Sequence, residues 1–193
     1  MHVVVLLLTL FVPLSATPSI AAEEPPIAKL PKHVPRIRPA DKRVATAFQQ
    51  GLERSASFRA LVDRLNQLDV IVYVEMQPLL RQRLSGAMTW VTATKEFRYV
   101  RVSLNPELNP LMMIASLAHE LRHVLEVGEA PSIIDNRSMT EYYRVAGIET
   151  RTNSDKWETE AAQRTGEVVR RELAASYNGA ADSIQARRSD ALR

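Results

Sequence analysis

The clearest chemical pattern in this sequence is the HExxH motif formed by His119, Glu120 and His123. Two histidines four residues apart project from the same face of an α-helix, one turn apart. Two neutral imidazoles at that spacing can bind one Zn²⁺ ion, and a catalytic zinc site takes three protein ligands and leaves the fourth position to water. Glu120 points about 100° away from His119, so it borders the ion without having to ligate it. The motif therefore predicts His119 and His123 as metal ligands and Glu120 as the base that acts on the water.

The residues around the motif have the apolar period of a helix that packs on a core. An apolar stripe lies opposite the two histidines and consists of Ile114, Leu117, Ala118, Leu121 and Leu125. Asn109 suits the N-cap and Pro110 the first helical position, and Gly128 is expected to end the helix. The pattern predicts an amphipathic helix whose histidines face a cleft. The alternative is a helix with two surface or core histidines and no metal.

The run Ala-His-Glu-Leu-Arg-His-Val-Leu-Glu at residues 118–126 resembles the active-site helix of the zincin metallopeptidases. The resemblance extends over about fifteen residues. It implies a minimal zincin core, in which a small twisted sheet precedes the metal helix and a later helix supplies the third ligand. It also implies a sheet edge beside the cleft that can pair with an extended peptide.

The third metal ligand has to come from outside the motif's two histidines. The long metzincin pattern is absent, because no histidine follows His123 at the sixth position, so a carboxylate from a later helix is expected, as in the gluzincins. In the last predicted helix Glu158 falls within the apolar stripe, where a carboxylate is costly unless something pairs with it. Glu160 falls on the solvated face and is the second candidate. The alternatives for Glu158 are a buried ion pair with an arginine or a solvated helix start.

Glu126 is a third candidate, but its Cα lies about 10 Å along the helix axis from that of His119. That distance is large for one shared ion. We expect Glu126 to line the cleft or to accept a hydrogen bond from the ring nitrogen of a histidine ligand. In the commonest gluzincin pattern the ligand glutamate is followed within a few residues by an aspartate that orients a histidine, and no aspartate follows Glu158 in this way.

The remaining periodicity predicts an α+β fold. Apolar residues repeat with a helical period over 41–69, interrupted near Gly51 and Ser55, which predicts two helices or one broken helix. Strands are expected at 70–74, 87–93 and 97–104, the last two joined as a hairpin. Further helices are expected at 131–146 and from about residue 157 onwards. The fold expected is a minimal zincin-like domain, in which a small antiparallel or mixed three-stranded sheet packs with the HExxH helix and the other helices.

The composition excludes several function classes. Of 193 residues, 24% are charged and 46% hydrophobic, and the formal net charge is +3, as in an ordinary soluble domain. Lys and Arg are scattered, so nucleic acid is not expected as a partner. The chain has no cysteine, which excludes a thiolate metal site and a Cys nucleophile. No Gly-x-Ser-x-Gly elbow occurs, and the other histidines, His2 and His33, lie outside the predicted domain, which argues against Ser-His catalysis.

The amino terminus resembles a secretory signal. Residues 3–14 are apolar, and small residues follow up to Ala22, where cleavage is expected. The apolar run is shorter than the roughly 20 residues of a membrane span, so no stable span is expected after signal removal, and an uncleaved anchor or a buried helix are the alternatives. The predicted organisation is a signal at 1–22, a Pro-rich linker at 23–40, a zincin-like domain at 41–180 and a polar tail at 181–193. These features predict a periplasmic or secreted protein.

Together these patterns predict an exported zinc-dependent peptidase that acts on a peptide or protein substrate. Zinc would activate its water and polarise the scissile carbonyl, and Glu120 would carry the proton to the leaving amine. Tyr142 or Tyr143 is a candidate for stabilising the oxyanion, with packing on the core as the alternative role. A rival is a non-catalytic exported zincin-fold protein with a structural zinc or a partner-binding cleft, which has no need of Glu120. A further rival is a helical interaction protein that binds no metal.

Overall fold

A computed structural model describes residues 34–78, 80, 84–146, 148–149 and 157–190, and for residues 148–149 and 180–190 the backbone alone. The predicted signal, most of the predicted linker and the segment 150–156 lie outside the described residues. None of the described helices is both long enough and apolar enough to cross a membrane.

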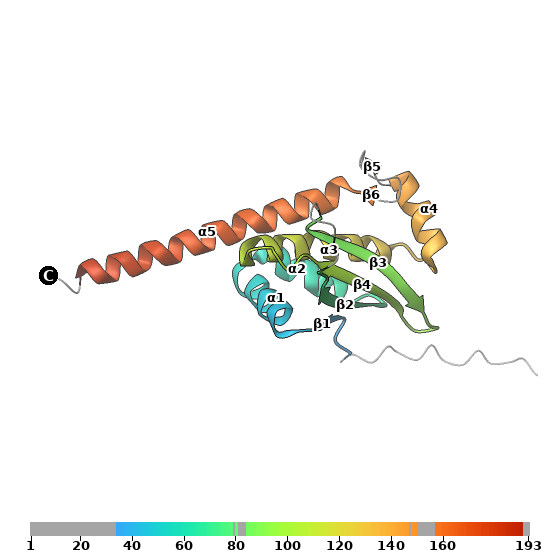
Figure 1. Ribbon diagram of the computed structural model, residues 1–193, viewed down its shortest axis with the longest axis horizontal. Helices are drawn as coiled ribbons and strands as arrows, with labels where there is room; N and C mark the ends of the chain where they lie inside the picture. Colours follow the sequence, from blue (N-terminus) through green and yellow to red (C-terminus); the bar gives the residue numbers. More distant parts are fainter. Residues whose placement is uncertain (1–33, 79, 81–83, 147, 150–156, 191–193) are drawn as a thin grey trace, which may run out of the picture. The chain divides into compact units, whose positions relative to one another are not determined.

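The main sheet has four strands in the order β1-β2-β4-β3 (Figure 1). They are β1 (Ile37–Pro39), β2 (Val70–Met76), β3 (Gly86–Ala93) and β4 (Arg98–Leu104). Strands β1, β2 and β4 are parallel, whereas β3 pairs antiparallel with β4 and is an edge strand. The predicted first strand and the predicted hairpin are therefore confirmed, and the sheet is mixed.

Strand β1 was not predicted, because it lies within the stretch expected to be a linker. The N–H of Val72 donates to Arg36 O at 2.7 Å, and the N–H of Ala40 donates to Val74 O at 2.8 Å. Pro39 is tolerated because an edge strand needs only one row of hydrogen bonds. The sheet consequently has four strands where the sequence pattern predicts three.

The face of the sheet that carries the core is formed by alternate residues of β2 and β4. The buried side chains on this face are Val70, Val72, Val74, Val100, Val102 and Leu104. They join one apolar cluster with side chains of α1 (Lys42–Arg54), α2 (Ala56–Leu65) and α3 (Pro110–Glu129). These helices therefore pack on that face of the sheet.

Helices α1 and α2 confirm the predicted break in the first helical stretch. Ser55 ends α1, since its N–H donates to Gly51 O, and it also caps α2, since its Oγ accepts from Phe58 N at 3.0 Å. One small polar residue thus serves both helix ends, as the sequence period suggests.

Helix α3 carries the HExxH motif and is the most deeply buried helix. Asn109 caps it, with Oδ1 accepting from Met112 N at 2.9 Å, and Pro110 occupies the first turn. The five residues of the predicted apolar stripe are all buried. The helix ends at Glu129, one residue beyond the expected end, where the Arg98 guanidinium donates to the carbonyls of Val127 and Gly128 at 2.7 and 2.8 Å.

The elements after α3 differ more from the sequence pattern. Helix α4 (Asn136–Ala146) begins at residue 136 and not at 131. A two-stranded sheet, β5 (Ile148–Glu149) with β6 (Trp157–Glu158), then precedes α5 (Glu160–Asp190), which extends through most of the expected polar tail. Helix α5 packs against α3.

Candidate metal centre

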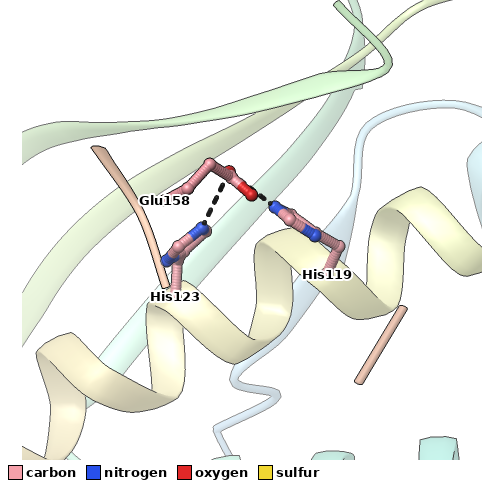
Figure 2. Close-up of side chains that lie close together, drawn as sticks. All are labelled: His119, His123 and Glu158. Carbon is pink, nitrogen blue, oxygen red and sulfur yellow. Dashed lines mark hydrogen bonds and ion pairs between the residues drawn. The ribbon is translucent and has the colours of Figure 1, made fainter. Parts of the chain in front are cut away.

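His119 and His123 lie on successive turns of α3, and the carboxylate of Glu158 at the end of β6 faces both (Figure 2). His119 Nε2 is 3.0 Å from Glu158 Oε1, and His123 Nε2 is 3.6 Å from the same oxygen. One ligand atom from each residue can be chosen so that all three lie within 4.8 Å of one another. The three residues expected as metal ligands are therefore brought together into a possible metal site.

The donor set fits a divalent ion. A tetrahedral ion with bonds of roughly 2.0–2.1 Å keeps neighbouring ligand atoms about 3.3 Å apart, and the two distances to Glu158, 3.0 and 3.6 Å, lie on either side of that value. His123 Nε2 is buried and has no hydrogen-bond partner among the described residues. A buried polar atom without a partner is costly, and a bound cation would satisfy it. Two nitrogens and one carboxylate oxygen suit zinc but do not exclude other transition metals.

Glu158 lies at the site as predicted, but its predicted place on the apolar stripe of the last helix is wrong. Glu158 precedes α5 and lies in the short strand β6. Thr159 is the residue that caps α5, because its Oγ1 accepts from Ala162 N at 3.1 Å. Glu160, the second candidate, is exposed and pairs with Arg164 one turn along the helix. A threonine just before a helical run is an N-cap signal, and it marks the true helix start.

The charges of the site depend on one another. Burial alone would raise the pKa of Glu158, but the hydrogen bond with His119, the close contact with His123 and the charges of both rings outweigh it and lower that pKa to about 2. Burial alone would lower the pKa of His123, but the carboxylates of Glu126 and Glu158 raise it to about 9. In the metal-free protein His123 is therefore protonated at neutral pH, and binding of a metal must release that proton.

Glu120 lies beside the triad without belonging to it. Its side chain is only 6% exposed. An added Cβ at Gly86, the first residue of β3, would be 2.9 Å from Glu120 Cγ and Oε1, so the glycine makes room for the carboxylate. Burial raises the pKa of Glu120 above its usual range, and it outweighs the opposing charges of His119 and His123.

Glu120, His119 and Glu158 border a pocket of about 400 Å³. Its other lining residues come from the approach to β3 and its start, from α3 and from α5, and they include Ser85, Gly86, Ala115, Ser116, Gly166 and Arg170. An equally large pocket beside α1 is lined by no histidine or carboxylate. Of these two pockets among the described residues, the pocket at Glu120 is the one with groups suited to catalysis.

Helix α5 approaches α3 closely beside this pocket because of Gly166. An added Cβ at that position would be 3.2 Å from both Ala115 O and His119 Cβ. Neither Gly86 nor Gly166 could be recognised from the sequence, because an isolated glycine gives no sign of which side chain it faces.

Glu126 orients His123 and is not a member of the metal triad. Its Oε2 is 3.0 Å from His123 Nδ1. An ionised carboxylate can only accept, so the Nδ1–H donates and Nε2 is left for a metal. The hydrogen bond expected between Glu126 and a histidine ligand is thus present.

Tyr143 supports this arrangement and does not face the pocket. It is buried, and its hydroxyl lies 3.0 Å from His123 O and 3.2 Å from Glu126 Oε2. Tyr142 packs edge-on against it, with ring centroids 5.2 Å apart. Tyr143 belongs to the apolar core, Tyr142 packs against it, and neither lines the pocket, so these contacts favour the packing role over stabilisation of an oxyanion.

Comparison with known proteins gives no match, whether with protein-family models, with curated proteins or with solved structures. The chemical interpretation of the site therefore depends on its geometry and on the residues of α3.

Proposed function

We propose that this protein is a metal-dependent peptidase in which His119, His123 and Glu158 hold a divalent ion, with zinc as the first candidate. The observation that carries the proposal is the place of Glu120. It is a buried carboxylate that borders both the pocket and the triad and is not one of the three ligands. A purely structural ion needs no such group. The likeness of residues 118–126 to the zincin helix supports the same chemistry.

The chain's own residues supply the proton transfers of hydrolysis. When bound, the ion would supply a Lewis acid and an activated water. A carboxylate oxygen of Glu120 takes a proton from the attacking water and returns it to the leaving amine as the peptide C–N bond breaks. Burial favours this role, because a raised pKa makes the Glu120 carboxylate a stronger base toward the proton of the water.

An extended peptide is the substrate that the surroundings of the pocket favour. Strand β3 is an edge strand, and within the described part of the chain no strand pairs with its outer edge. The start of β3 borders Glu120 at Gly86. A substrate added as a further strand along β3 would place its backbone beside the triad.

The proposal includes the place of action. The apolar run at 3–14 and the small residues up to Ala22 support export, so the substrates would be peptides or proteins outside the cytoplasm.

Metal content and peptide cleavage test the function together. The purified mature protein is compared with Glu120→Gln and with the double variant His119→Ala, His123→Ala, using elemental analysis and mass spectrometry of a mixed peptide library. We expect about one ion per chain in the wild type and in Glu120→Gln, and none in the double variant. Cleavage should fall by about 10²–10⁴-fold in Glu120→Gln, the usual size of general-base catalysis.

Two results would contradict the proposal in different ways. If the wild type takes up no metal when zinc is offered, the proposed metal site is wrong. A wild type that binds one ion and cleaves nothing favours the rival interpretation, a structural zinc or a cleft that binds a partner.

A further inference from the structure

We propose that Thr159 is a positioning residue that fixes the third ligand, Glu158, to the helix that carries the other two. The proposal rests on the metal site proposed above. It assigns to Thr159 a role that neither its place in the sequence nor the ligand triad indicates.

Thr159 follows Glu158 directly and is buried, with 7% of its surface exposed. Its hydroxyl makes two hydrogen bonds in opposite senses. Oγ1 donates to Glu126 Oε1 at 2.8 Å and accepts from Ala162 N at 3.1 Å. One hydroxyl thus starts α5 and joins that start to α3.

The acceptor of this hydrogen bond is the carboxylate that also orients a histidine ligand. Glu126 uses Oε1 for Thr159 and Oε2 for His123 Nδ1, at 2.8 and 3.0 Å. The neighbour of the third ligand and the ring of the second ligand are therefore bound to opposite oxygens of one side chain. The positions of Glu158 and His123 are linked without any metal.

Few other contacts of this kind hold Glu158 in place. Among the strands that the structure describes, β6 pairs with β5 and with no strand of the main sheet. Apart from the contacts of Glu158 itself with the two histidines, the Thr159–Glu126 hydrogen bond is the one polar link between the described residues 157–162 and α3. Without it the carboxylate of Glu158 must be ordered when the ion binds, and ordering reduces affinity.

The expected loss of metal affinity can be estimated from other proteins in which a hydrogen bond to a metal ligand has been removed. Loss of such a partner typically weakens metal affinity by about 10–100-fold. We therefore expect Thr159→Val, which keeps the shape of the side chain and removes the hydroxyl, to weaken zinc and cobalt binding by about that factor.

Three further variants separate positioning from helix capping. Thr159→Ser keeps the hydroxyl and should restore wild-type binding. Thr159→Gly removes the hydroxyl but keeps a good N-cap residue, so it tests the link to Glu126 with little loss of capping. Thr165→Val is the matched control, because the Thr165 hydroxyl donates within α5, to Ala161 O at 2.7 Å, and does not contact Glu126.

In the experiment the metal-free mature proteins are titrated with Co²⁺ and Zn²⁺. Binding is measured by calorimetry and, for Co²⁺, also by its visible absorption. We expect wild type, Thr159→Ser and Thr165→Val to agree within about threefold, and Thr159→Val and Thr159→Gly to bind about 10–100-fold more weakly. The Co²⁺ spectrum should change in these last two variants alone, because the carboxylate ligand is no longer held.

The outcomes distinguish this proposal from the function on which it rests. If Thr159→Val and Thr159→Gly match Thr165→Val in affinity and spectrum, Thr159 only caps the helix and the positioning role is wrong. If Thr159→Val does not fold, Thr159→Gly decides by the same two readouts. If the wild type itself binds neither ion, the metal site fails, and the positioning role fails with it.

Discussion

Glu120 and Glu158 are two carboxylates beside the same pair of histidines, yet their pKa values move in opposite directions. Burial dominates for Glu120 and raises its pKa, whereas for Glu158 burial is outweighed by the hydrogen bond with His119 and the nearby ring of His123, which lower its pKa to about 2. Two carboxyl groups whose pKa values are shifted apart in this way can have different roles in one site. Glu158 therefore stays ionised, as the proposed ligand role requires, and the raised pKa of Glu120 suits its proposed role as the base.

The position of Glu120 depends on a neighbouring residue without a side chain. In Gly86→Ala the new Cβ would lie 2.9 Å from Glu120 Cγ and Oε1, and because the end of this side chain is flexible, the carboxylate should move while the fold remains. We expect peptide cleavage to fall at least about tenfold, since a displacement of about 1 Å can cost up to a hundredfold. Metal content should stay at the wild-type level.

Gly179→Ala is the matched control, because no atom lies within 4 Å of a Cβ added there. It should cleave like the wild type. Equal activity in both alanine variants would show that Glu120 does not need its present position, and loss of metal from Gly86→Ala would show that the strand affects the ligands and not the base.

At the level of elements, α5 is the helix that completes the pocket, and it is fixed to the rest of the fold at more than one point. Gly166 brings it against α3 beside His119. Further along, Glu172 Oε2 accepts from Ser55 Oγ at 2.5 Å and from Ser57 N at 3.1 Å, and Oε1 accepts from Ser57 Oγ at 2.6 Å. A carboxylate of α5 thus satisfies the start of α2, where free N–H groups favour negative charge.

Glu172 should make stability depend on pH. Burial alone would raise its pKa, but the hydrogen bonds from Ser55 and Ser57 outweigh burial and hold the pKa below its usual value of 4.5. The unfolded chain then binds the proton more readily, so the contribution of Glu172 is complete above pH 4.5 and is lost as the pH falls through the folded pKa. Urea unfolding should show Glu172→Gln to be less stable by about 1 kcal/mol at pH 7, a value that allows for partial exposure.

The difference between wild type and Glu172→Gln should shrink in acid. Glu160→Gln is the control on the same helix, because its partner Arg164 is an exposed surface contact and its loss should change stability little. A difference that stays constant down to pH 3 would mean that the Glu172 hydrogen bonds do not depend on its charge.

Across the whole molecule, the features that were predicted correctly are those that depend on residues close to one another in the sequence. The break at Ser55, the hairpin of β3 and β4, and the cap of α3 at Asn109 all follow from short-range chemistry and are present. Strand β1 was not predicted, because its strand character comes from pairing with β2, about 35 residues further along the chain, while Pro39 argues against a strand. The hydrogen bond between Thr159 and Glu126 was not predicted, because the two residues are brought together only by the packing of α5 on α3.

The proposed ion would join parts of the chain that are separate in sequence, and this makes global stability a test of the site. His119 and His123 belong to the core helix α3, whereas Glu158 precedes α5. An ion that binds only the folded protein stabilises it by about 2.7 kcal/mol at a free concentration of 100 Kd. For a chain of this length that corresponds to roughly 5–11 °C in Tm.

The measurement is thermal unfolding of the metal-free protein with and without Zn²⁺, beside the double variant His119→Ala, His123→Ala. Mg²⁺ at the same concentration should give no shift, since it prefers oxygen ligands in octahedral geometry. An equal shift from Zn²⁺ in the double variant would place the ion elsewhere on the molecule. If the wild type binds Zn²⁺ without any shift, the ion does not distinguish the folded from the unfolded chain, and it cannot be held by ligands that only folding brings together.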